Sequence, residues 1–459
     1  MLKPQPAHRR RLRAGNEMIP DTPALLTDFY ALTMAEAYFD LGMCDTAVFE
    51  LFVRRLPDAR RYLVAAGLEQ IVDYLEGWRF LPDELEFLAG LNRFSPRFLD
   101  HLAGLRFTGS LHAMPEGTPL FAEEPMIRIT APMVQAQFVE SRVINLAHFQ
   151  TMIASKAVRC VAAANRHGLI DFGMRRAHGS EAAIYAARAA FLAGFDGTAT
   201  VEAGRRFGIP LSGTLAHSFI EAHDDEEAAF RRFTRACGQN VTLLIDTYDI
   251  GRGARRAARV AQEMPGAVRA VRIDSGDLAA QTREVRRILD EEGCRGVQIV
   301  LSGNLDEYRV EALLRAGVPA DAFGIGTHLD VSQDAPSLDM AYKLQEYAGT
   351  ARRKRSPGKE TWPGTKQVAR ERDAAGHFCA DHVALATEAV PGFALLQPVM
   401  RDGRRITALP PLPAIREYCR DQCALLPPEL RAIGGAESRY PVHLSSGIRA
   451  LARQLSAGD

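Results

Sequence analysis

Between residues 168 and 328 the sequence repeats one pattern, in which a short apolar run ends in Asp, Arg, His, Ser or Gly. The runs end near residues 172, 197, 214, 245, 273, 301 and 325. Amphipathic helical patterns lie between the later runs, as in the face shared by Leu278, Val285 and Ile288. Seven strand–helix units in series predict a β/α barrel, and an open doubly wound sheet is the alternative.

Polar side chains follow most of these runs. In a β/α barrel the C-terminal strand ends form one rim, where functional groups from several strands converge. The candidates at this rim are two arginines, four carboxylates and a histidine: Arg175, Arg272, Asp246, Asp249, Asp274, Asp277 and His217. The turns Ser302-Gly303-Asn304 and Gly324-Ile325-Gly326 end the last two runs, where barrels commonly bind a phosphate through backbone N–H groups. The rim is therefore expected to bind a phosphorylated ligand with a second anionic or polar group.

The chain is expected to divide into four segments. Residues 1–20 carry basic side chains and no apolar segment, which predicts a disordered tail. Residues 21–150 combine helical patterns with strand-like pieces, such as a helix within 25–41 and a strand at 46–54, and predict an α+β domain. The barrel is assigned residues 151–345, and a long helical pattern leads into it from Pro132 toward Cys160. Residues 346–459 begin with a basic, turn-rich loop, Arg352–Lys366, and are expected to pack back on the first domain.

Composition excludes several classes of protein. The 56 basic and 56 acidic residues balance, so whole-protein attraction to nucleic acid or to an anionic membrane is not expected. No apolar stretch approaches the ~20 residues of a membrane span. Seven scattered cysteines without a C-x-x-C pair favour neither a disulfide framework nor a zinc site. Cys419 and Cys423 are expected to be structural thiols on one helix face, and the protein is expected in the reducing cytoplasm.

Two local patterns concern the helices that follow the rim. Asn304 and Glu307 have the spacing of a capping box, which predicts a helix start there. Asp277 either caps the next helix or faces a ligand, and the sequence leaves both readings open.

Seven ordered motifs carry a family resemblance over nearly all of residues 22–400. They are Leu-Leu-Thr-Asp-Phe-Tyr (25–30), Asp-Phe-Gly-Met-Arg-Arg (171–176), Gly-Phe-Asp-Gly-Thr (194–198), Gly-Thr-Leu-Ala-His-Ser (213–218), Ile-Asp-Thr-Tyr-Asp (245–249), Arg-Ile-Asp-Ser-Gly-Asp (272–277) and Pro-Gly-Thr-Lys-Gln-Val (363–368). The sequence resembles the nicotinate phosphoribosyltransferases, which make nicotinate mononucleotide from nicotinate and phosphoribosyl pyrophosphate with ATP hydrolysis. The resemblance implies an α+β domain, an irregular α/β barrel, and a homodimer whose active site lies where two subunits meet.

The resemblance also assigns roles to individual residues. His217 would be phosphorylated by ATP, and Asp246, on a neighbouring strand end, is the expected partner of its other ring nitrogen; a histidine satisfied at the rim is the alternative. His217, Asp246 and Asp274 are the candidate catalytic residues. The expected substrate-binding residues are Tyr30, Phe172, Arg175, Thr214 and Arg272, and the expected phosphate-binding residues are Ser302, Gly303, Gly324 and Gly326.

Within this set, Phe172 and Tyr30 of a second subunit would stack on the two faces of the pyridine ring. Arg175 and Arg272 would share the nicotinate carboxylate and the ribose phosphates, in an order that the sequence leaves open. Asp274 and Asp277 would face the ribose hydroxyls or a Mg²⁺ bound to pyrophosphate. Mg²⁺ is the expected cofactor and ATP the expected co-substrate.

Ala199 favours the acid over the amide as substrate. Nicotinamide-using relatives carry an aspartate after the corresponding Gly-Thr, where it accepts a hydrogen bond from the amide and would repel a carboxylate. This sequence has Gly197-Thr198-Ala199 instead. The alternatives are a nicotinamide or quinolinate phosphoribosyltransferase and, from another class, a non-catalytic ligand-sensing barrel.

Overall fold

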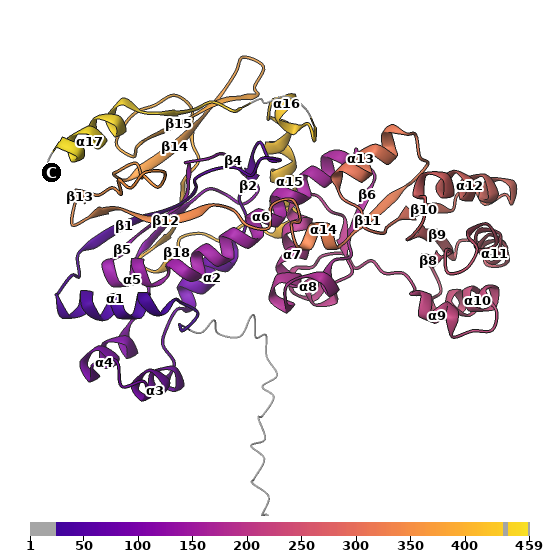
Figure 1. Cartoon of the computed structure of the whole chain (residues 1–459), viewed down its shortest axis with the longest axis horizontal. Coiled ribbons are helices and arrows are strands. Elements are labelled where there is room, and N and C mark those ends of the chain that lie inside the picture. Colours follow the sequence, from indigo (N-terminus) through magenta and orange to yellow (C-terminus); the bar gives the residue numbers. More distant parts are fainter. Residues whose placement is uncertain (1–23, 435–438, 458–459) are drawn as a thin grey trace, which may run out of the picture.

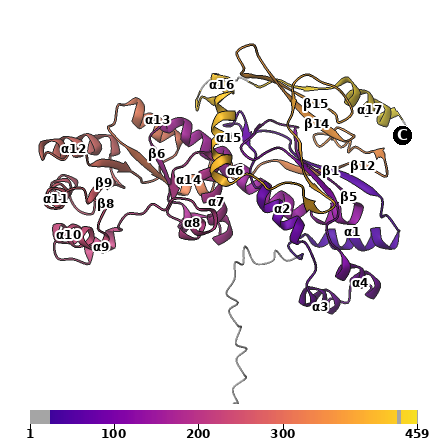
Figure 2. The same ribbon diagram turned by 180° about the vertical axis from the view of Figure 1, so that it is seen from behind.

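The computed structural model describes residues 24–434 and 439–457, so the predicted tail at 1–20 lies outside the described residues. The molecule is elongated (Figure 1). A parallel sheet with its helices forms one end, an antiparallel seven-stranded sheet and a mixed four-stranded sheet form the other, and the long helix α6 (Glu140–Ala164) runs between them. The same arrangement is seen from behind in Figure 2. The fold is mixed α/β, as predicted.

A six-stranded parallel sheet forms the barrel half. Its order is β7-β6-β11-β10-β9-β8. The strands are β6 (Gly168–Asp171), β7 (Gly197–Thr198), β8 (Val241–Leu244), β9 (Val268–Ile273), β10 (Gln298–Leu301) and β11 (Ala322–Ile325). The sheet curls, but its edge strands β7 and β8 do not pair. The predicted irregular barrel is therefore confirmed in an incompletely closed form.

One of the seven predicted strands is wrong. The run ending near residue 214 forms no strand, and only Leu211 makes an isolated bridge to Thr198. The edge strand β7 has two residues, so it offers no further edge with which residues 212–216 could pair. The chain instead passes through an irregular loop into α9 (His217–Glu221).

Helices cover the parallel sheet and connect its strands. They are α7 (Ser180–Ala193), α8 (Val201–Phe207), α10 (Glu226–Cys237), α11 (Ile250–Glu263), α12 (Leu278–Glu291), α13 (Glu307–Arg315) and α14 (Thr327–Asp330). Asp277 accepts hydrogen bonds from the backbone N–H groups of Ala279 and Ala280, so it caps α12. The predicted Asn304–Glu307 capping box is wrong, because Asp306 caps α13 and Asn304 has a left-handed backbone at φ 51°.

The first domain and the C-terminal segment share one seven-stranded sheet of order β13-β12-β1-β5-β3-β17-β18. Its strands are β1 (Thr46–Val53), β3 (Ser110–Ala113), β5 (Pro125–Pro132), β12 (Met340–Tyr347), β13 (Thr350–Ala351), β17 (Gln397–Arg401) and β18 (Arg404–Arg405). The helices of the first domain are α1 (Phe29–Asp40), α2 (Leu68–Gly77), α3 (Pro82–Gly90), α4 (Pro96–Gly104) and α5 (Met133–Phe138). Because β12 pairs along the whole of β1, the chain returns from the parallel sheet to the N-terminal sheet.

The remaining C-terminal elements pack on this sheet, as predicted. A four-stranded sheet contains β14 (Lys366–Arg372), β15 (Phe378–Leu385), β16 (Phe393–Ala394) and β19 (Val442–Leu444). The C-terminal helices are α15 (Leu412–Ala424), α16 (Pro428–Arg431) and α17 (Ser446–Ala457). In the first domain, a separate two-stranded sheet joins β2 (Leu63–Val64) to β4 (Pro119–Leu120). Cys419 and Cys423 lie one turn apart on α15, as expected of structural thiols on one helix face.

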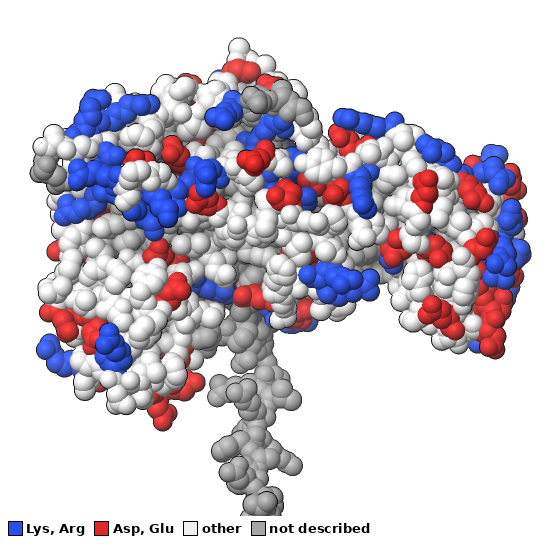
Figure 3. Space-filling view, viewed as in Figure 1, with Lys and Arg blue, Asp and Glu red and all other residues white. Residues whose placement is uncertain are grey.

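Lys and Arg side chains gather over this C-terminal part, near β13 and α17 (Figure 3). The basic loop Arg352–Lys366 is tied down at both ends. Arg353 donates a hydrogen bond to the carbonyl of Ala452 on α17 (3.0 Å), and the buried Lys366 pairs with Glu50 (2.8 Å).

None of the described helices has the length and apolar character needed to cross a membrane.

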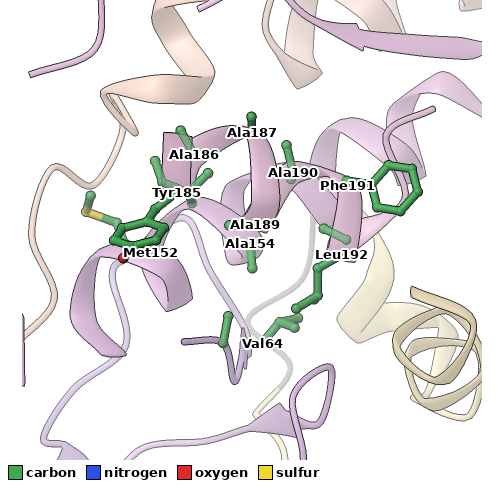
Figure 4. Close-up of a cluster of buried hydrophobic side chains, with 14 of the residues drawn as sticks. Val64, Met152, Ala154, Tyr185, Ala186, Ala187, Ala189, Ala190, Phe191 and Leu192 are labelled. Carbon is green, nitrogen blue, oxygen red and sulfur yellow. The ribbon is translucent and has the colours of Figure 1, made fainter. Parts of the chain in front are cut away.

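Buried ion pairs join the two halves through α6 and α7. Figure 4 shows a cluster of buried hydrophobic side chains in which α7 contributes several alanines together with Tyr185, Phe191 and Leu192. On the same helix, the fully buried Arg188 donates two hydrogen bonds to Glu116 of the first domain, both at 2.8 Å. On α6, Lys156 and Arg159 pair with the buried Glu307 of α13 at 2.6 and 2.9 Å. These charges fix the barrel helices against the N-terminal half.

Candidate functional site

The carboxyl ends of the parallel strands bring most of the predicted residues together. Phe172 follows β6, Asp246 follows β8 by one residue, and Asp274 follows β9. Ser302 follows β10, and Gly326 follows β11. Because all of these strands are parallel, their carboxyl ends face one edge of the sheet. The predicted rim therefore exists as one surface.

Arg272 is the centre of this surface. Its guanidinium donates hydrogen bonds to Ser302 Oγ (2.8 Å), Thr214 Oγ1 (2.7 Å) and Asp274 Oδ1 (2.6 Å). It also lies over the Phe172 ring, 5.4 Å from the ring centroid, in a cation–π arrangement. One nearly buried cation thus connects two strands, the loop before α9 and the aromatic ring.

The electrostatics around Asp274 follow from this arrangement. Burial raises the pKa of the Asp274 carboxyl, but the hydrogen bond from Ser302 and the charge of Arg272 outweigh burial, and the pKa is lowered overall. The nearby His217 contributes in the same direction. Asp274 is therefore held as an anion between Arg272 and Ser302.

The expected pairing of Asp246 with His217 is wrong. His217 Nδ1 instead lies 3.1 Å from Thr247 Oγ1. Asp246 Oδ2 accepts from the backbone N–H of Asp274 (2.9 Å) and from Ser275 Oγ (2.7 Å). Asp246 therefore faces the segment after β9, while Thr247 faces the histidine. The other oxygen, Asp246 Oδ1, is buried and has no hydrogen-bond partner among the described residues.

The glycines of the two late turns are required by close contacts. A Cβ atom at Gly324 would lie 2.4 Å from the Phe172 ring, so only glycine leaves room for that ring. Gly303 has φ 94°, and a Cβ there would lie 2.0 Å from the carbonyl oxygen of Asp274. Gly326 lies against the Phe172 backbone. Gly303 thus allows close approach to the Asp274 backbone, and Gly324 allows close approach of the Phe172 ring. Both glycines also offer backbone N–H groups.

A buried pair of carboxyl groups, Asp171 and Asp330, lies directly beneath Phe172, and no local sequence pattern indicates it. Asp171 accepts hydrogen bonds from Gly173 N (2.8 Å) and Thr198 Oγ1 (2.6 Å). Asp330 of α14 is buried beside it, so close that a Cβ at Gly173 would meet the Asp330 carboxyl at 2.1 Å. Burial, and then the charge of Asp171, raise the pKa of Asp330 well above its usual value. Such a pair favours retention of a proton at pH values where an ordinary aspartate has lost it.

Two predicted residues are not among the hydrogen-bond partners of Arg272. Arg175 belongs to the short 3-10 helix η1 (Met174–Arg176) and is exposed. Tyr30 lies on α1, where its hydroxyl donates to Glu140 Oε2 (3.0 Å). Figures 1 and 2 both place α1 at the opposite end of the molecule from β9. Within one chain, Tyr30 therefore does not reach the rim.

The chain is similar to known proteins along most of its length. The family model of the nicotinate phosphoribosyltransferase (NAPRTase) N-terminal domain matches residues 25–148, that of the NAPRTase family matches 167–352, and that of the C-terminal domain matches 393–452. A nicotinate phosphoribosyltransferase of Mycobacterium tuberculosis is 48% identical over 428 residues, which cover 93% of this chain and 92% of that protein. One of Bacillus subtilis is 36% identical and covers 93% of each.

Two solved structures share the fold. The human nicotinic acid phosphoribosyltransferase has a TM-score of 0.83 at 28% identity and covers 94% of this chain and 99% of its own. A nicotinate-nucleotide pyrophosphorylase from Pyrococcus furiosus has a TM-score of 0.73 at 26% identity and covers 90% of this chain and 99% of its own.

The buried acid pair predicts an unusual dependence of stability on pH. Because the pKa of Asp330 is raised by folding, the folded state keeps a proton that the unfolded state loses above about pH 4. The contribution of this proton to the free energy of unfolding is fully present below that pH. It is lost as pH rises through the pKa that Asp330 has in the folded state. The side chain of Asp330→Asn stays neutral, so this loss is absent from the variant. The free energy of unfolding of the variant minus that of wild type should therefore increase with pH, by up to about 1.4 kcal/mol per pH unit.

Urea denaturation between pH 4 and pH 9 measures this difference. Asp290→Asn, on the exposed side of α12, is the matched control and should show no such trend. Curves for Asp330→Asn and wild type that stay parallel over the whole range would contradict the shared proton.

Proposed function

Because the chain belongs to the nicotinate phosphoribosyltransferase family, we propose that its rim transfers the phosphoribosyl group of phosphoribosyl pyrophosphate to nicotinate. The products are nicotinate mononucleotide and pyrophosphate, and the reaction serves NAD salvage. The cluster around Arg272 carries the proposal, because it combines an aromatic face, a cation and glycine turns on one rim. These are the groups that a flat aromatic acid and a sugar phosphate need.

The pyridine ring stacks on the face of Phe172 that Arg272 does not cover. The ring position is fixed because Gly324 and the buried Asp171 and Asp330 support Phe172 and Gly173 from behind. The nicotinate carboxylate and the ribose phosphates bind to Arg272 and to Arg175, whose exposed side chain is free to move toward a ligand. As the pyridine nitrogen attacks the ribose C1, the C1–O bond to pyrophosphate breaks, and positioning of these two groups accounts for much of the rate.

The acidic residues fit a Mg²⁺ ion that accompanies the pyrophosphate. Asp246 Oδ1 is buried without a hydrogen-bond partner in the described chain, which is the state of an oxygen that could ligate a cation. No group of three or more potential ligands occurs within the described residues, and Mg²⁺ commonly takes only one or two protein carboxylates. Asp246 and Asp274 would hold the ion, which would stabilise the negative charge of the leaving pyrophosphate.

Ala199 tests the choice between nicotinate and nicotinamide. It is exposed at the rim, beside the carboxyl end of β6, where its N–H donates to the Asp171 carbonyl (2.8 Å). Ala199→Asp would place an anion near the substrate carboxylate. The ratio of kcat/KM for nicotinate to that for nicotinamide should fall by about tenfold or more.

The measurement is product formation from nicotinate, nicotinamide and quinolinate, with carbon dioxide release as the sign of quinolinate use. Ala199→Asn adds the same volume without charge and should retain most of the preference. Wild-type protein that uses nicotinamide or quinolinate better than nicotinate would refute the proposed substrate.

His217 is proposed to couple ATP hydrolysis to transfer. In the tautomer whose Nδ1 donates to Thr247 Oγ1, Nε2 carries the lone pair and can attack the γ-phosphate of ATP, so that ADP leaves and a phosphohistidine forms. The phosphate adds negative charge beside Asp274 and Arg272. This charge is proposed to alter the affinity for phosphoribosyl pyrophosphate, and its later hydrolysis draws the equilibrium toward product.

His217→Ala should therefore reduce ATP hydrolysis during turnover by more than about a hundredfold while slow transfer persists. ADP and nicotinate mononucleotide are measured together, and acid-labile phosphate is mapped after incubation with ATP labelled in the γ-phosphate. His223→Ala, on the turn that follows α9, serves as the control and should keep the coupling. ATP hydrolysis in step with product in His217→Ala would rule out this role.

We further propose a homodimer in which Tyr30 completes the partner's site. Leu26, Phe29 and Tyr30 form an exposed apolar group at the start of α1, 46%, 54% and 45% exposed, as expected of a surface that a second copy covers. An aromatic residue on this surface can reach a partner's Phe172 although it cannot reach its own.

Mixing two inactive variants tests this arrangement. Tyr30→Ala and Phe172→Ala should each have little activity, and their equimolar mixture, after subunit exchange, should recover about a quarter of wild-type activity, since half of the dimers are mixed and each has one intact site. A mixture that stays as inactive as its components, although dimers exchange, would show that Tyr30 acts in its own subunit or not at all.

A further inference from the structure

A second cavity lies away from the rim, between α6, α7 and α15. Its volume is about 390 Å³, within the range of small-molecule sites. Apolar side chains from the ends of α6 and α7 form one wall: Val158, Val161, Ala162 and Ala193. Tyr62 and the thiols of Cys419 and Cys423 form another part of the lining. The cavity can therefore hold an apolar ring or a short chain.

This cavity is separate from the proposed active site. The parts of α6 and α7 that line it lead into β6 and β7, which begin at Gly168 and Gly197. It thus lies at the amino ends of these strands, while Phe172 and Thr198 lie at their carboxyl ends. None of the rim residues described above lines it.

Arginines at the cavity are available to an anion. Arg416 donates to the Gly194 carbonyl (2.9 Å) and to Asp196 (2.8 Å), but its Nε is buried and has no partner among the described residues. Arg431 lines the cavity and has no ion-pair partner within residues 24–434 and 439–457. Arg420 also lines it and pairs only with its exposed neighbour Asp421. An unsatisfied buried donor costs free energy, which an acceptor on a ligand would recover.

We propose that this cavity is a binding site for a small amphipathic carboxylate. The apolar body packs on the α6 and α7 wall, and the carboxylate accepts hydrogen bonds from Arg431 and from Arg416 Nε. A planar carboxylate matches the guanidinium fork. A single negative charge is favoured because Glu417 also lines the cavity and would repel a dianion.

Calorimetric titration of the full chain with 4-phenylbutyrate tests the proposal. Binding with one site per chain is expected, and 4-phenylbutanamide, which lacks the charge, should bind at least about tenfold more weakly. Arg431→Ala should weaken 4-phenylbutyrate binding by about tenfold, whereas Arg287→Ala, an exposed arginine on α12, should leave it unchanged. Ala162→Trp fills the cavity from an exposed helix position and should abolish binding without disturbing the core.

Cys423 supplies an independent local readout. Its thiol lines the cavity and is half-buried, whereas Cys237, at the end of α10, is exposed and distant in the fold. Saturating 4-phenylbutyrate should slow alkylation of Cys423 by N-ethylmaleimide and leave Cys237 unaffected, as measured by peptide mass spectrometry. The proposal is overturned if no binding occurs, if Arg431→Ala and Ala162→Trp bind as wild type, or if Cys423 is not protected.

Discussion

The rim depends on one nearly buried cation. The three hydrogen bonds of Arg272 end on Ser302, Thr214 and Asp274, and its guanidinium covers one face of Phe172. Taking an arginine out of water is costly unless each donor finds an acceptor, so these partners are held in position as much as the arginine itself. The same charge keeps Asp274 ionised, and Asp246 holds the Asp274 backbone from the other side. Side chains held by these contacts are already positioned before a ligand arrives, which is what transfer between two bound substrates requires.

Buried carboxyl groups and ion pairs behind the rim hold its loops and helices in place. Asp171 and Asp330 hold the Phe172–Gly173 turn, and Glu307, with Lys156 and Arg159, fixes α13 just after the Ser302–Asn304 turn. Arg188 ties α7 to Glu116 of the first domain. The barrel sheet is incompletely closed, and its edge strand β7 has two residues. Ion pairs through α6 and α7 therefore provide a rigidity that a closed ring of strands would supply in a regular barrel.

Periodicity and strand-end chemistry were enough to predict most of this architecture. The runs ending at Ile245, Ile273, Leu301 and Ile325 end at or within one residue of strand ends, because apolar runs followed by Asp, Ser or Gly are strong local signals. The strand predicted near Thr214 was wrong, because a strand must pair with the edge of a neighbouring strand, and β7 is too short to offer one. Local spacing suggested Asn304 as a cap and Asp246 as the histidine partner. The backbone at Asn304 is left-handed instead, and Thr247 contacts the histidine while Asp246 binds the Asp274 backbone. The role of Asp330 could not be predicted, since it depends on contact between α14 and Asp171, which is distant in the sequence.

The central claim is that the guanidinium of Arg272 organises substrate binding. Its most direct test is the kcat/KM for nicotinate mononucleotide formation by Arg272→Lys, which keeps the charge but loses the planar fork. Two lost charge-assisted hydrogen bonds should lower kcat/KM by about a hundredfold. Arg269→Ala, an exposed arginine on the other face of β9, should stay near wild type. An Arg272→Lys protein that is folded and retains kcat/KM within about twofold of wild type would contradict this account.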